Sequence, residues 1–167
     1  GYTPAIIFMH RELGIEYMNQ DTLAAIFSGE ITNWSDVGGP DAEIIPVVAQ
    51  DTHPWIYFHW AIFSGENDAW RDDMVYVDNL EEVNQFVMDN WNAIAISGTW
   101  AEPESLIAVG IDGIPTTGGN LMRGEYPMQW ANVLTSDTNW DNMSELEHRF
   151  IEFIYSDEVW AHIWEQG

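Results

Sequence analysis

The histidines come first among residues that could carry chemistry, because His side chains bind metals and transfer protons near neutral pH. His53 and His59 lie six residues apart in the stretch AQDTHPWIYFHW (49–60), which has the pattern of a helix start. This spacing turns the two side chains to different faces of a helix, whereas a metal-binding pair needs a spacing of four. The remaining histidines, at positions 10, 148 and 162, stand alone. We therefore predict no metal site.

The serine and carboxylate patterns do not predict catalysis either. Ser-Gly pairs occur at residues 28, 64 and 97, but none falls within the Gly-x-Ser-x-Gly pattern of a hydrolase nucleophile, and we interpret them as ends of helices or strands. The acidic runs 66–73 and 78–82 offer oxygen ligands for calcium without the spacing of an EF-hand, which favours solvated charge. The sequence predicts neither an enzyme nor a bound cofactor.

Net charge narrows the range of partners. The chain has 28 Asp and Glu against four Arg and no Lys, which gives a formal charge of -24 and a pI near 4.1. Nucleic acids and anionic lipids are bound largely through Lys and Arg, so both are excluded as partners. Two interpretations of the acidic surface stay open: adaptation to salt or to an acidic medium, and attraction of cations or of a basic protein.

The hydrophobic pattern predicts alternating strands and helices in a single core. With 167 residues and no Cys, the chain has the size of one domain and no disulfide. It contains no apolar run of about 18 residues, so no membrane insertion is predicted. Strands are predicted at 4–9, 43–48, 93–97, 106–112 and 131–136, and helices after Asn19 or Asp21, after Thr52, after Asn79 and within 143–164. This order is typical of an α/β sheet.

Five phrases occur together, in order, in one known family. LAAIFSGEITNWSDVGGPDAEIIPV (23–47), NWNAIAIS, VGIDGIPTT, GEYPM and the closing FIEFIYSDEVWAHIWEQG resemble the phosphate-binding proteins of phosphate ABC transporters. The resemblance implies a type II periplasmic-binding-protein-like α/β fold, with a mixed sheet flanked by helices. It also implies one complete lobe in residues 1–120, including the entering crossover strand, and a return segment in 121–167 that belongs to the other lobe. The N-terminal segment of that lobe has no counterpart among these residues.

The same resemblance implies that residues 49–55 correspond to the family's oxyanion-binding loop. At this point the family has an Arg followed by Asp-Gly-Ser-Gly-Thr at a helix start, where small residues, backbone N–H groups and hydroxyls surround an oxyanion. The corresponding residues here are Ala49, Gln50, Asp51, Thr52, His53, Pro54 and Trp55. Ala49 has no guanidinium, Pro54 has no N–H, and Trp55 replaces a hydroxyl. We therefore expect the anion site to be degenerate. A small oxyanion is accordingly a doubtful ligand.

The ten Trp offer a second function. Trp34, Trp91 and Trp164 fall in apolar patterns and are predicted in the core, whereas others lie near loops or helix starts. Trp60, Tyr126 and Trp130, which replaces an Arg that the family commonly has after Tyr-Pro, are candidate cleft or interface residues. Trp is enriched at protein interfaces. A protein partner or self-assembly is therefore expected.

Three functional hypotheses follow from these patterns. The first is a non-enzymatic extracytoplasmic domain, periplasmic, cell-surface or secreted, with a structural or protein-binding role. The second is an ABC-transporter substrate-binding protein for phosphate or another small ligand, whose N-terminal segment is supplied by further sequence or by another chain. The third is a hydrolase on the same scaffold, which no motif favours.

Overall fold

The computed structural model describes residues 2–50, 52–66, 69–98, 104–131 and 139–156 of the chain. The chain divides into two compact units, 1–132 and 133–167. The helices are α1 (Gln20–Ser28), α2 (His53–Phe63), α3 (Leu80–Asp89), α4 (Gly118–Arg123) and α5 (Glu145–Ile154). The strands are β1 (Tyr2–Pro4), β2 (Ile6–His10), β3 (Tyr17–Met18), β4 (Ile45–Ala49), β5 (Val75–Val77), β6 (Ala93–Ser97), β7 (Leu106–Ala108), β8 (Gly110–Ile111) and β9 (Gln129–Ala131).

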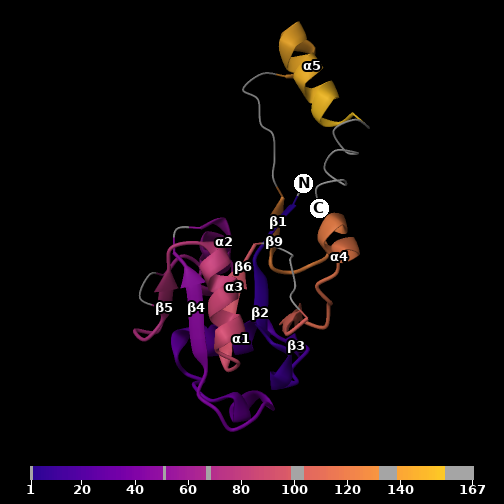
Figure 1. Cartoon of the computed structure of the whole chain (residues 1–167). Helices are drawn as coiled ribbons and strands as arrows, with labels where there is room; N and C mark the ends of the chain where they lie inside the picture. Colours follow the sequence, from indigo (N-terminus) through magenta and orange to yellow (C-terminus); the bar gives the residue numbers. More distant parts are fainter. Residues whose placement is uncertain (1, 51, 67–68, 99–103, 132–138, 157–167) are drawn as a thin grey trace. The chain divides into compact units, whose positions relative to one another are not determined.

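A five-stranded mixed sheet forms the centre of the first unit, in the order β5-β4-β6-β2-β7 (Figure 1). Strand β4 runs parallel to β5 and β6, whereas β2 runs antiparallel to β6 and β7. Two short pairs lie outside it, the antiparallel β1–β9 and the parallel β3–β8. The carboxyl ends of the parallel strands β4 and β6 share one edge, which is where α/β proteins commonly bind ligands.

Alternating side chains of this sheet supply two hydrophobic cores. Ile6 and Phe8 of β2 join Val83 and Val87 of α3 on one face. On the other face, Ile7 and Met9 join residues of α1 and α2, among them Leu23, Ile26, Phe27 and Phe58. Figure 1 shows α3 lying across the sheet. Because successive residues of a strand point to opposite faces, helices on both sides require the continuous apolar runs seen in β2, β4 and β6. The α/β fold expected from the sequence is confirmed.

Side-chain caps explain where two of these helices begin. Asn19, one of the two predicted caps of α1, accepts a hydrogen bond from the Thr22 N–H at 2.7 Å, and Asn79 accepts one from the Glu82 N–H at 3.0 Å. These bonds satisfy N–H groups that the first turn of a helix leaves unpaired. Gly29 ends α1 with φ +86°, a conformation that glycine adopts without steric cost.

Several sequence predictions need correction. Trp91 is 43% exposed because α3 ends at Asp89, before the helical stripe could turn it inward. The strand predicted at 106–112 is two strands, β7 and β8, which pair with different partners. Trp34 is buried, as predicted, and its Nε1 donates to the Asn92 carbonyl at 2.8 Å. The predicted strand 131–136 lies largely outside the described residues, as do Trp164 and His162.

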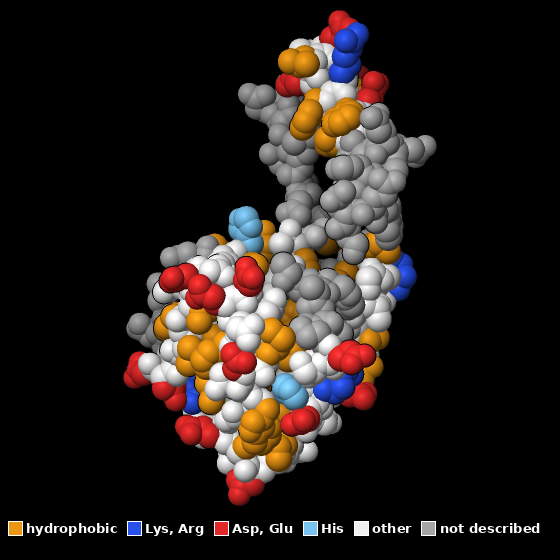
Figure 2. Space-filling view, viewed as in Figure 1, with side chains coloured by type: hydrophobic (Ala, Val, Ile, Leu, Met, Phe, Trp, Pro, Cys, Tyr) orange, Lys and Arg blue, Asp and Glu red, His pale blue; other side chains and the backbone are white. Residues whose placement is uncertain are grey.

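Acidic side chains are spread over the face seen in Figure 2, and basic ones are few there. This distribution agrees with the formal charge of -24. Within the described residues, every helix is too short or too polar to cross a membrane.

Candidate functional site

The turn between β4 and α2 carries the residues predicted to correspond to an anion site. Ala49 is buried at the end of β4, and Thr52 holds the N-cap position of α2 with an extended backbone. The Thr52 hydroxyl donates to the Ala49 carbonyl at 2.7 Å and makes no hydrogen bond to a first-turn N–H. The side-chain cap expected from Thr52 is therefore absent. Asp51 lies outside the described residues.

Pro54 fills the space between this turn and the end of β6. A Cβ atom added at Gly98, just after β6, would lie 2.6 Å from Pro54 Cγ, so the pyrrolidine ring lies directly against the Gly98 backbone. Pro54 is buried and has no N–H to donate. The first turn of α2 therefore offers an incoming anion one donor fewer than an ordinary helix start, and an apolar ring in its place.

His53, Tyr57 and Trp130 form a stack that we call the outer stack. The His53 and Tyr57 rings are nearly parallel with centroids 6.1 Å apart, and those of Tyr57 and Trp130 are 4.8 Å apart at 20°. His53 is exposed, whereas the other two are partly buried. The stack thus joins the start of α2 to β9 through ring contacts, where the resemblance suggests that related proteins have an Arg.

A second aromatic group packs along the other side of α2. We call it the Trp70 cluster; it comprises Phe27, Trp55, Phe58, His59, Phe63 and Trp70. The Trp70 ring contacts the other five, and its Nε1 donates to His59 Nδ1 at 2.9 Å. Trp55 stacks on His59 with centroids 5.5 Å apart, and its own Nε1 is buried with no hydrogen-bond partner. Trp55 is therefore a packing residue whose indole N–H could still donate.

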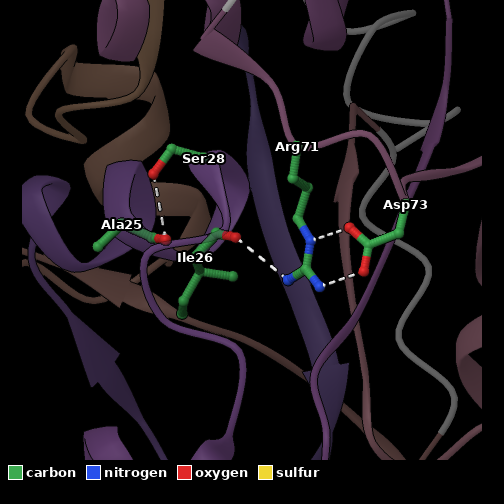
Figure 3. Close-up of polar contacts among 5 residues, drawn as sticks. All are labelled: Ala25, Ile26, Ser28, Arg71 and Asp73. Atoms are coloured by element: carbon green, nitrogen blue, oxygen red, sulfur yellow. Dashed lines mark hydrogen bonds and ion pairs between the residues drawn. The ribbon is translucent and has the colours of Figure 1, made fainter.

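Every permanent cation of the chain lies within the described residues and is engaged with other groups. Arg11 donates to the carbonyls of Glu104 and Leu106. Arg123 pairs with Glu125, and Arg149 pairs with Glu145, both at 2.8 Å. Arg71 is buried and pairs with Asp73 through two hydrogen bonds (Figure 3). None of these contacts is with the residues of the β4–α2 turn.

The remaining candidate residues lie in different environments. Trp60 is 62% exposed on α2, and its ring lies against Gly65. Tyr126 is only 1% exposed, and this burial raises the pKa of its phenol to about 12. Trp60 thus remains accessible to a partner, whereas Tyr126 is a neutral core residue at ordinary pH.

The sequence missed several contacts of this region. Trp70 lies within an acidic run of the sequence, yet its ring contacts five other rings of the Trp70 cluster. The hydrogen bond between His59 and Trp70 joins residues eleven apart in the sequence, and no local pattern predicts such a contact. Residues 69–70 did show a signal, since an Ala-Trp pair interrupts the acidic run 66–73.

The donor chemistry of the described residues does not fit a metal. They contain no group of three His, Asp or Glu side chains arranged to hold one.

The chain is similar to known proteins in both sequence and structure. A family model described as a PBP superfamily domain matches residues 1–158. The phosphate-binding protein PstS of Bacillus subtilis is 24% identical over 151 residues, which are 89% of this chain and 48% of that protein. The chain therefore spans about half the length of this relative.

Solved structures show the same fold. An ABC-type phosphate transport receptor from Vibrio cholerae superposes with a TM-score of 0.81 and 20% identity, covering 99% of this chain and 68% of the receptor. PstS from Borrelia burgdorferi gives a TM-score of 0.79 and 21% identity, with coverage of 99% and 68%. In both comparisons, about a third of the other chain has no counterpart among these residues.

Proposed function

Because the chain belongs to the PBP superfamily, we propose that it is a non-enzymatic, extracytoplasmic binding-protein-like domain whose oxyanion site has been lost. Its role would be structural or protein-binding, in a surface or extracellular assembly. The observation that carries this proposal is the β4–α2 turn, where an apolar ring and an aromatic stack occupy the edge at which a ligand would meet the sheet. The proposal concerns this chain and is separate from what its relatives bind.

Charge supports the loss of anion binding. A phosphate group needs charge-assisted hydrogen bonds, each worth about 1.5–3 kcal/mol. The four Arg are engaged elsewhere and the sequence has no Lys, so this chain has no free permanent cation to offer at the turn. The formal charge of -24 adds a repulsive field.

The alternative function is that of a substrate-binding protein for phosphate or another small ligand. The names of two relatives favour this function. PstS is named a phosphate-binding protein, and the Vibrio cholerae protein is named an ABC-type phosphate transport receptor. Backbone N–H groups at the start of α2 and the unpartnered Trp55 Nε1 are the donors that would remain for such a ligand.

Thermal unfolding in the presence of phosphate separates the two functions. We expect 1 mM phosphate to shift the midpoint by less than about 0.5 °C, because a ligand with a dissociation constant above roughly 10 mM stabilises by less than ~0.1 kcal/mol. A micromolar site would instead add about 4 kcal/mol and raise the midpoint by roughly 8–16 °C. Such a rise would refute the proposed loss.

Ionic strength must be matched in this experiment. Salt screens repulsion among the acidic side chains and stabilises the chain without binding specifically. Sodium chloride at the same ionic strength is therefore the reference, and sulfate is a second oxyanion. Stabilisation by phosphate and sulfate equal to that by chloride is the expected result.

We further propose that the C-terminal part of the chain, predicted to begin at residue 121, belongs to a second lobe. Helix α5 supports this proposal because three of its apolar side chains are exposed: Leu146, Phe150 and Phe153 are 77%, 52% and 55% exposed. A capping box between Ser144 and Glu147 holds the helix start, and these hydrogen bonds lower the pKa of Glu147. An amphipathic helix with such a face normally packs on another element.

Amide hydrogen exchange tests the second lobe. If the source gene encodes residues ahead of Gly1, we expect amides of α5 to exchange more slowly in the longer product than in the 167-residue chain, because the apolar face becomes covered. Amides of β2 and β6 serve as the internal control and should exchange alike in both. Equal exchange of α5 in the two products, or a gene without such residues, would contradict the proposal.

A further inference from the structure

We infer that His59 forms a proton-sensitive contact that holds the segment 69–73 against α2. This inference goes beyond the proposed function, since it concerns control of the fold and requires no ligand. It rests on the hydrogen bond between Trp70 Nε1 and His59 Nδ1, at 2.9 Å, inside the Trp70 cluster.

The donor fixes the protonation state of the acceptor. An indole N–H can only donate, so His59 Nδ1 must carry no proton, and the imidazole is neutral with its proton on Nε2. Adding a second proton converts Nδ1 into a donor and places two N–H groups opposite one another. The contact cannot survive that change without rearrangement.

Burial increases the consequence of protonation. His59 is 5% exposed, and its ring contacts those of Trp55 and Trp70, with centroids 5.5 Å and 5.9 Å away. The indole faces would attract an imidazolium. However, the proton that creates this charge also removes the acceptor, and the Trp70 N–H would join that of Trp55 as a second buried donor without a partner. Opening of the cluster to water relieves both.

Among the described residues, the charged side chains near the cluster are either paired or exposed, and Glu66, just after α2, is also exposed. On the segment 69–73, the Arg71 charge is paired with Asp73, and Asp72 is exposed. On the side of α1, Asp21 and Glu30 line a hollow together with Phe63 and Ala69. Both carboxylates lie at the solvent side of that hollow, as their exposure indicates. On α2 itself, His53 is exposed at the helix start.

Loss of this contact would loosen more than one side chain. The backbone N–H of Arg71 donates to the Phe27 carbonyl at 3.0 Å. The Arg71 guanidinium donates to the Ile26 carbonyl (Figure 3), so the segment that carries Trp70 is also hydrogen-bonded to the end of α1. Protonation of His59 would therefore weaken the packing of α1 and α2 together. At lower pH, the end of the helix pair away from the β4–α2 turn becomes the less stable part.

Urea unfolding at pH 7.5 and pH 5.5 tests this inference, with near-UV circular dichroism as the readout. The variants are His59→Gln, whose amide oxygen can still accept the indole N–H without titrating in this range, and His53→Gln as the matched control on the same helix. On going from pH 7.5 to 5.5, we expect the unfolding constant of the wild type to rise by up to about tenfold relative to His59→Gln, because a histidine in an unfolded chain is about nine-tenths protonated at pH 5.5, and tenfold is the limit for a folded chain that takes up no proton. His53→Gln should behave as the wild type does.

The many carboxylates also make unfolding depend on pH, but they do so equally in all three proteins. Comparing the variants therefore removes their contribution. An equal pH response in wild type and His59→Gln would overturn the inference. If His59→Gln does not fold, the indole N–H signal of Trp70, assigned with Trp70→Phe, decides the question in the wild type. We expect that signal to shift and broaden below pH 6, and an unchanged signal down to pH 5 would also overturn the inference.

Discussion

Replacing Trp70 with alanine will lower the free energy of unfolding by about 3 kcal/mol, the lower end of the range for truncating a large core aromatic, because Trp70 is partly buried. The Trp70 ring contacts the rings of five neighbours, including Phe27 on α1 and Phe63 on α2. Its removal leaves a cavity between the two helices and deprives His59 of its donor. Chemical denaturation followed by far-UV circular dichroism measures the loss.

Trp60→Ala is the matched control for this substitution. Trp60 lies on α2, the helix that also carries four residues of the Trp70 cluster, yet Trp60 is 62% exposed. We expect its replacement to change the free energy of unfolding by less than about 1 kcal/mol. A similar loss for Trp60→Ala and Trp70→Ala would contradict the placement of Trp70 at the centre of the core cluster.

Replacing Asp73 with alanine should have the second largest effect, a loss of about 2 kcal/mol. The Arg71 side chain is 5% exposed and would remain buried without its anion, a situation that costs roughly 3–5 kcal/mol where both partners are buried. The smaller value applies here because the Asp73 side chain is 62% exposed and water screens the pair. Asp72→Ala, the substitution of an exposed neighbour, should be nearly neutral.

The same ion pair predicts the direction of an acid effect. The hydrogen bond from Arg71 holds the pKa of Asp73 below its ordinary value of 3.8. A carboxyl with a lowered pKa in the folded state stabilises the fold above that ordinary value and loses this contribution as pH falls below it. Asp73→Asn should therefore unfold with a weaker dependence on pH below about 4 than the wild type. An unchanged dependence would contradict the ion pair.

The fold could be predicted to a large extent because the chain gives local signals for it. Continuous apolar runs marked β2, β4 and β6 as strands covered on both faces, and Asn19 and Asn79 marked helix starts through side-chain caps that the structure contains. The family resemblance, which the comparisons confirm, supplied the topology. The two-residue strand β3 carries no such run and was missed, and β8 was predicted only as the end of a longer strand at 106–112.

The candidate site could be predicted only in its chemistry. Residue types at 49–55 predicted a turn without an Arg and with a proline that has no N–H, and that prediction did not need coordinates. The contacts seen at this turn involve distant parts of the chain: Gly98 lies against Pro54, and Trp130 stacks on Tyr57. Pairings of this kind depend on the order of strands in the sheet, which a local pattern does not contain.

The central claim is that the turn between β4 and α2 does not bind phosphate. Titration of the ¹⁵N-labelled chain with phosphate, observed through the backbone amides of Thr52, His53 and Trp55, tests it at the residues themselves. We expect their signals to move no further than they do in sodium chloride of equal ionic strength, even at millimolar phosphate. Saturating shifts of these amides at micromolar phosphate would contradict the claim and establish a working anion site.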